Sequence, residues 1–172
     1  MSDWILFLCL CLVTGSISAA EYIYNDFDFE ELPQRLIIDE VEGTGSIGAF
    51  DKHFGGYVCK IDEDFLCFVS WSWQFAIPKD YKPSKISSWS YDEREYKLEK
   101  SGHKIIVFGE ELVVDVISSK YNFLDEAKGT YFFYYSQDRG IIGFGNRAQG
   151  SNSSRYFLLQ GRCGFGAKAT CK

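Results

Sequence analysis

The chain has six cysteines, of which Cys9 and Cys11 lie in the apolar first twenty residues, and the other four are the residues most able to form covalent links. They occur as two pairs, Cys59 with Cys67 and Cys163 with Cys171, and the partners in each pair are eight positions apart. A hairpin turn through the acidic centre of KIDEDFL would place Cys59 opposite Cys67, with Cα atoms about 4.5–5.5 Å apart, which suits a disulfide. The spacing therefore favours the two local disulfides, although four cysteines also allow two other connectivities. A structural zinc site is disfavoured, because its ligand pairs are typically only about two to four residues apart.

Two histidines are the candidates for a general base. His53 and His103 could each activate a serine or cysteine, but the sequence contains no G-x-S-x-G element and the cysteines are expected to be oxidised. A catalytic base also needs an orienting partner, which the sequence does not indicate. We therefore interpret both histidines as turn or surface residues.

A glycine motif and several acidic runs are the remaining chemical signals. The segment from Gly43 to Gly48 reads GTGSIG and satisfies G-x-G-x-x-G, but no helix pattern follows it, so we interpret it as a glycine-rich turn between strands. A D-x-D-x-E run could offer oxygens to calcium but lacks the glycine and the distal glutamate of an EF-hand loop. A glycosidase would need two carboxylates about 5–10 Å apart, which sequence alone cannot test. The acidic runs are Asp26, Asp28, Glu30 and Glu31; Asp62, Glu63 and Asp64; Asp92, Glu93 and Glu95; Glu110 and Glu111.

Aromatic residues provide the candidate binding surface. The run TYFFYYSQDRGIIGFG predicts a hairpin with a four- or five-residue loop, in which Gly140 can adopt a positive φ. Its first strand carries aromatic residues on both faces, so one face could serve as a binding anchor. The predicted partner-binding residues are Tyr135, Asp138 and Arg139 at the loop from Ser136 to Gly140. Trp71, Trp73 and Phe75 are instead expected to fill the core.

The elements that must position these residues are mostly strands. From Phe65 to Ile77 the apolar residues alternate with period two, which predicts one long strand with a bend or bulge near residues 70–72. Short helices are possible only at 27–32 and 122–128. The predicted fold class is mainly β: an antiparallel sandwich or barrel-like sheet with at most one or two short helices. Further strands are predicted at 34–41, 56–61, 88–92, 95–98, 104–108, 112–118, 130–135, 140–145 and 155–160.

The first twenty residues predict export. An apolar stretch from Trp4 to Val13 is followed by small residues, which is typical of a secretory signal peptide with a cut before Glu21, although its start, MSD, lacks a positive charge. Residues 1–20 are thus a predicted signal peptide and 21–172 a single β-rich domain. Localisation would be secreted or periplasmic, with no membrane span after cleavage, and two disulfides fit that compartment. The sequon at Asn152 matters only if the host glycosylates exported proteins.

Composition narrows the function classes. The 172-residue chain is 46% hydrophobic and 17% aromatic, which excludes a disordered protein. Its net charge of −6, with no basic cluster, argues against a nucleic-acid partner. We expect no cofactor and predict a non-enzymatic binding or inhibitor-type protein that acts on a protein partner. The alternatives are a β-barrel carrier of a small apolar ligand, whose bulky strand residues argue against an empty interior, or a small hydrolase with a carboxylate pair.

Overall fold

A computed structural model describes residues 19–26, 33–49, 52–60, 63–70, 73–107, 109–121, 129–147, 150, 154–168 and 171. Residues 1–18 of the predicted signal peptide, both predicted helices and Asn152 lie outside these residues, whereas Ala19 and Ala20 are described and Ala20 is the first residue of the first strand. The strands are β1 (Ala20–Asp26), β2 (Gln34–Asp39), β3 (Thr44–Ala49), β4 (Lys52–Val58), β5 (Phe65–Ser70), β6 (Gln74–Pro78), β7 (Ser88–Tyr91), β8 (Arg94–Val107), β9 (Glu110–Tyr121), β10 (Thr130–Ser136), β11 (Gly140–Arg147) and β12 (Arg155–Leu159).

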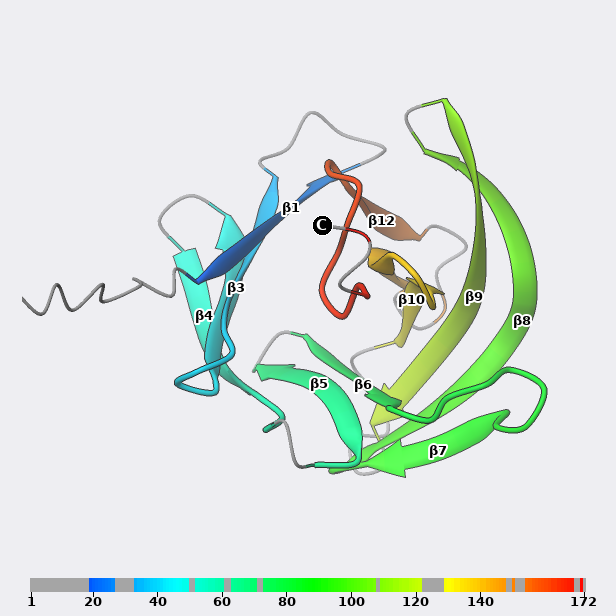
Figure 1. The fold of residues 1–172 in the computed structure, drawn as a ribbon, viewed down its shortest axis with the longest axis horizontal. Helices are drawn as coiled ribbons and strands as arrows, with labels where there is room; N and C mark the ends of the chain where they lie inside the picture. Colours follow the sequence, from blue (N-terminus) through cyan, green and yellow to red (C-terminus); the bar gives the residue numbers. More distant parts are fainter. Residues whose placement is uncertain are drawn as a thin grey trace, which may run out of the picture.

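All twelve strands belong to one antiparallel sheet that curls into a nearly closed barrel (Figure 1). The order is β6-β5-β4-β3-β2-β1-β12-β11-β10-β9-β8-β7, so two six-stranded meanders join where β1 pairs with β12. Figure 1 shows β8 and β9 as long, curved strands, and their pairing shifts register twice between Leu98 and His103. Such bulges bend a strand and increase its twist, which helps the sheet to curl. The predicted mainly-β fold class is confirmed.

Side chains bridge the seam between the two edge strands, β6 and β7. The indole nitrogen of Trp89 donates to the carbonyl oxygen of Ala76 at 2.9 Å. The Tyr96 hydroxyl donates to the Gln74 carbonyl oxygen at 3.4 Å, and the Gln74 amide donates to the Tyr91 carbonyl oxygen at 3.5 Å. These bonds satisfy main-chain groups that an exposed strand edge would otherwise present to other chains.

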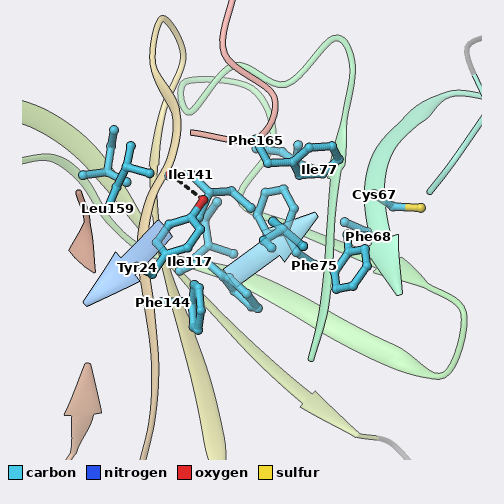
Figure 2. Close-up of a cluster of buried hydrophobic side chains, with 14 of the residues drawn as sticks. Tyr24, Cys67, Phe68, Phe75, Ile77, Ile117, Ile141, Phe144, Leu159 and Phe165 are labelled. Carbon is cyan, nitrogen blue, oxygen red and sulfur yellow. Dashed lines mark hydrogen bonds between the residues drawn. The ribbon is translucent and has the colours of Figure 1, made fainter. Parts of the chain in front are cut away.

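Aromatic and aliphatic side chains fill the interior (Figure 2). Phe144 lies at its centre, with ring centroids 4.8 Å from Tyr24 and 4.4 Å from Trp73. The buried Tyr24 hydroxyl donates to the carbonyl oxygen of Ile141 at 3.1 Å, the bond that Figure 2 marks. A cavity of about 20 Å³ remains among these side chains. That is room for one water molecule, since a water needs about 10–15 Å³.

The segment from 161 to 168 enters the barrel and closes its core. Figure 1 shows this orange-to-red segment inside the ring of strands. Phe165 has no exposed surface, and its carbonyl oxygen accepts a hydrogen bond from the Ile141 amide at 2.9 Å. The Gly164 amide donates to the Arg139 carbonyl oxygen at 2.8 Å. The C-terminal segment is thus hydrogen-bonded to the start of β11 and acts as an internal plug.

The structure corrects the prediction of one strand from Phe65 to Ile77. The chain reverses after Ser70, and β5 pairs antiparallel with β6, placing Phe68 opposite Phe75. The Ser70 amide and hydroxyl both donate to the Trp73 carbonyl oxygen, at 2.8 and 2.9 Å. Six residues lie between Phe68 and Phe75, so the face that even-numbered residues occupy in β5 is occupied by odd-numbered residues in β6, and the odd-numbered apolar series of the sequence does not lie on one face.

The glycine motif also differs from its predicted turn, because five of its six residues lie in β3. Only Gly43 is in the turn, with a φ of 67°. A Cβ on Gly48 would lie 1.9 Å from the Lys52 carbonyl oxygen, and one on Gly45 would lie 2.9 Å from the Ile37 carbonyl oxygen. These two glycines therefore permit close approach of neighbouring main chains rather than phosphate binding.

Candidate binding surface at the β10–β11 loop

The hairpin that carries the predicted partner-binding residues forms with a tighter loop than expected. Ser136 pairs with Gly140, so only residues 137–139 lie between the strands. Gly140 has a φ of 73°, the left-handed conformation that the sequence predicted. The Arg139 amide donates to the Ser136 hydroxyl at 3.3 Å. The loop is thus short and internally hydrogen-bonded.

Tyr135 is half-buried. Its ring centroid lies 6.1 Å from both Phe75 and Tyr81, so the ring packs on the barrel wall. Burial raises the pKa of the Tyr135 hydroxyl, and the negative charges of Asp115 and Asp138 raise it further. Tyr135 therefore anchors the end of β10 next to the loop, and it also lines the surface beside the loop.

Ion pairs fix the tip of the loop. Asp138 accepts a hydrogen bond from the Lys168 ammonium at 2.7 Å, and the Arg139 guanidinium donates to the Glu110 carboxylate at 2.7 Å. The hydrogen bond from Arg139, together with its positive charge, lowers the pKa of Glu110. The structure therefore brings Tyr135, Asp138 and Arg139 together at one site, and both charged residues contact other elements.

Asp115 is a residue of this site that the sequence analysis missed. It pairs across the sheet with Tyr135 and is only 7% exposed. One carboxylate oxygen accepts a hydrogen bond from the Tyr81 hydroxyl and the other from the Gly102 amide, each at 3.1 Å. Burial and the Asp115 charge raise the pKa of Tyr81. The sequence does contain a sign of this residue's special role, because Asp115 is the one acidic residue inside the apolar run LVVDVIS.

The cysteines form two disulfides, in the local pairs that their spacing favours. Cys59 is bonded to Cys67 with Cα atoms 5.0 Å apart, and Cys163 to Cys171 at 5.8 Å. The Tyr91 hydroxyl lies 3.0 Å from the sulfur of Cys59, which ties the first disulfide to the β7 side of the seam. The second disulfide closes the loop that contains the plug.

The other chemical candidates lie away from this site. His53 is an exposed residue of β4 and His103 is half-buried in β8, so neither occupies a turn. Asp26 pairs with Arg155 at 2.8 Å, while Asp28 and Glu30 lie outside the described residues. Within the described ranges, no three His, Cys, Asp or Glu residues form a group suited to a metal ion. No helix in the described part of the chain has the length and apolar character needed to cross a membrane.

Comparison with known proteins adds no identification, because no protein-family profile, no curated protein and no solved structure matches this chain.

Proposed function

We propose that this chain is an exported, disulfide-stabilised binding or inhibitor-type protein that acts on a protein partner through the β10–β11 loop. The observation that carries the proposal is the filled interior. The cavity among the described interior side chains is about 20 Å³, far smaller than the roughly 300–1,000 Å³ of pockets that hold drug-sized ligands. A partner must then contact the outer surface, and the carrier alternative is disfavoured.

The rigidity of the loop supports its role as a contact surface. Glu110 holds Arg139, Lys168 holds Asp138, and the plug is hydrogen-bonded behind them. A surface that is ordered before binding loses less conformational entropy on association. Gln137 is exposed at the loop tip, where a partner can reach it.

The two disulfides support export. Disulfides persist in secreted and periplasmic proteins and are rare where glutathione keeps thiols reduced. We propose that residues 1–20 are a signal peptide removed before Glu21. Mass spectrometry of protein secreted from its native host should then find an amino terminus at or next to Glu21, whereas an intact Met1 would contradict this.

Site-specific photo-crosslinking tests the binding role. A photoreactive side chain at Gln137 should capture a protein from the exported fraction of the producing cells, and excess unmodified protein should compete. The matched control carries the same group at Glu93, an exposed residue in the turn between β7 and β8. Equal capture at both positions, or none at Gln137, would contradict the proposal. If the protein instead shows hydrolase activity, and changing a single carboxylate residue abolishes that activity, the enzyme alternative would replace the binding proposal.

A further inference from the structure

A surface pocket of about 270 Å³ lies beside the β10–β11 loop. Its walls come from β8, β9, β10 and the loop, and include Gly102, Val113, Asp115, Tyr135 and Gln137. The pocket lies where β8 shifts register against β9 between Lys100 and His103. That irregularity places Gly102, with a φ of 63°, so that its amide points at Asp115.

Asp115 gives the pocket its chemistry. Its carboxylate is more than nine-tenths buried, and the two groups that hydrogen-bond to it, the Tyr81 hydroxyl and the Gly102 amide, are both neutral. Among the described residues that line the pocket there is no Lys, Arg or His. Burying a carboxylate away from water is costly unless a positive charge compensates it. Coulombic attraction to an incoming cation is also stronger at such a site than in bulk water.

The rim of the pocket also favours a positively charged ligand. The Tyr135 ring lines the wall, and aromatic rings attract cations positioned over their faces. Asp138 adds a second carboxylate at the mouth, where Lys168 partly neutralises it. The net charge of −6 for the whole chain adds long-range attraction for a basic partner.

We propose that this pocket receives one lysine or arginine side chain of a protein partner, with its charged end directed at Asp115. This inference rests on the proposed function and specifies the chemistry of the partner. The pocket is slightly smaller than the roughly 300–1,000 Å³ of drug-sized ligand sites, so a single long side chain matches its volume better than a free organic ligand.

Titration with Nα-acetyl-lysine amide and Nα-acetyl-arginine amide, followed by NMR, tests the pocket directly. At least one probe should shift the Gly102 amide resonance in a saturable way, with a millimolar Kd. Nα-acetyl-norleucine amide, which lacks the charge, should not. Asp115→Asn should weaken binding at least tenfold, while Glu93→Gln, the same charge change at a remote exposed turn, should leave it within twofold. Equal binding of charged and uncharged probes, or equal effects of the two variants, would overturn the proposal.

A pair of rim variants keeps the test valid if Asp115→Asn fails to fold. Gln137 is exposed, so Gln137→Lys and Gln137→Glu should both fold. Gln137→Lys should weaken probe binding at least threefold and Gln137→Glu should strengthen it, whereas equal affinities would overturn the proposal.

The crosslinked partner distinguishes this inference from the proposed function. If a protein is captured at Gln137 but Asp115→Asn and Gln137→Lys do not reduce capture, the pocket proposal fails and the binding function stands. If the charged probes bind but no protein is captured, the site serves a free amine and both proposals fail. If these variants reduce protein capture in parallel with probe affinity, both the pocket proposal and the proposed binding function are supported.

Discussion

Replacing Gly164 by alanine should disrupt the internal plug. A Cβ at this position would lie 1.9 Å from the Ile141 carbonyl oxygen and 2.8 Å from the Ile141 carbonyl carbon. Both atoms are main chain in β11, which is paired on both sides by β10 and β12. The strand cannot move aside as a flexible side chain would, so the plug itself must shift.

The size of the required shift sets the energetic cost. An ordinary Cβ contact begins near 3.4 Å, so the segment would have to retreat by about 1.5 Å. That movement breaks the bonds from Gly164 to Arg139 and from Ile141 to Phe165, each contributing about 0.5–1.5 kcal/mol. It also withdraws the buried Phe165 ring, and complete loss of a buried phenylalanine costs about 3–5 kcal/mol. We expect a loss of about 3 kcal/mol or more, which lowers the Tm by about 6–12 °C for a domain of this size.

Gly161 provides a matched control in the same segment. A Cβ there has no neighbouring atom within 4 Å, so Gly161→Ala makes the same chemical change without a clash. Thermal unfolding followed by near-ultraviolet circular dichroism, with both disulfides intact, should separate the two variants. If Gly164→Ala and Gly161→Ala melt within about 2 °C of each other, less than 1 kcal/mol separates them and the plug is not seated as described.

Three other perturbations test the seam, the second disulfide and the buried tyrosines. Trp89→Phe removes the bond to Ala76 and should cost about 1–3 kcal/mol in urea unfolding, and wild-type stability would contradict the bridging role of the indole. Changing Cys163 and Cys171 together to serine should cost about 2.5 kcal/mol through loop entropy, whereas free thiols in peptide maps of the native protein would refute the pairing. Burial raises the pKa of Tyr24 above its ordinary value of 10.0, so the unfolded chain loses that proton first. The contribution of Tyr24 to stability should be complete below about pH 10 and fall as the pH rises above it, and a Tyr24→Phe variant whose unfolding free energy falls just as steeply above pH 10 would contradict this.

The sequence predicted best those elements in which local signals and tertiary packing agree. The β10–β11 hairpin has two apolar runs around a turn whose glycine adopts the expected positive φ. The pairing of Cys59 with Cys67 was predicted from a hairpin between two strands, and β4 and β5 do pair antiparallel beside this disulfide. Both predictions depend on residues close together in sequence.

Most of the failures arise where distant parts of the chain decide the structure. The turn between β5 and β6 is a local exception, because it carries no glycine or proline and is held by hydrogen bonds between Ser70 and Trp73 that composition does not reveal. The GTGSIG motif is a strand because β2 and β4 pair with its two sides. Asp115 becomes part of a site only when Tyr81 and Gly102 meet it in three dimensions. The filling of the barrel by Phe165 is likewise a tertiary event.

The pairing of β1 with β12 has a consequence for the order in which the protein folds. Tyr24 pairs with Leu159, so the central strand pair of the sheet joins residues from opposite ends of the described chain. Neighbouring hairpins such as β8–β9 can form locally, but the two meanders cannot join until β12 has been synthesised. Until that moment each meander presents an unpaired strand edge, which is the type of surface that aggregates. Folding should therefore be completed after synthesis, and a chain that stops before β12 should be trapped as two open half-sheets.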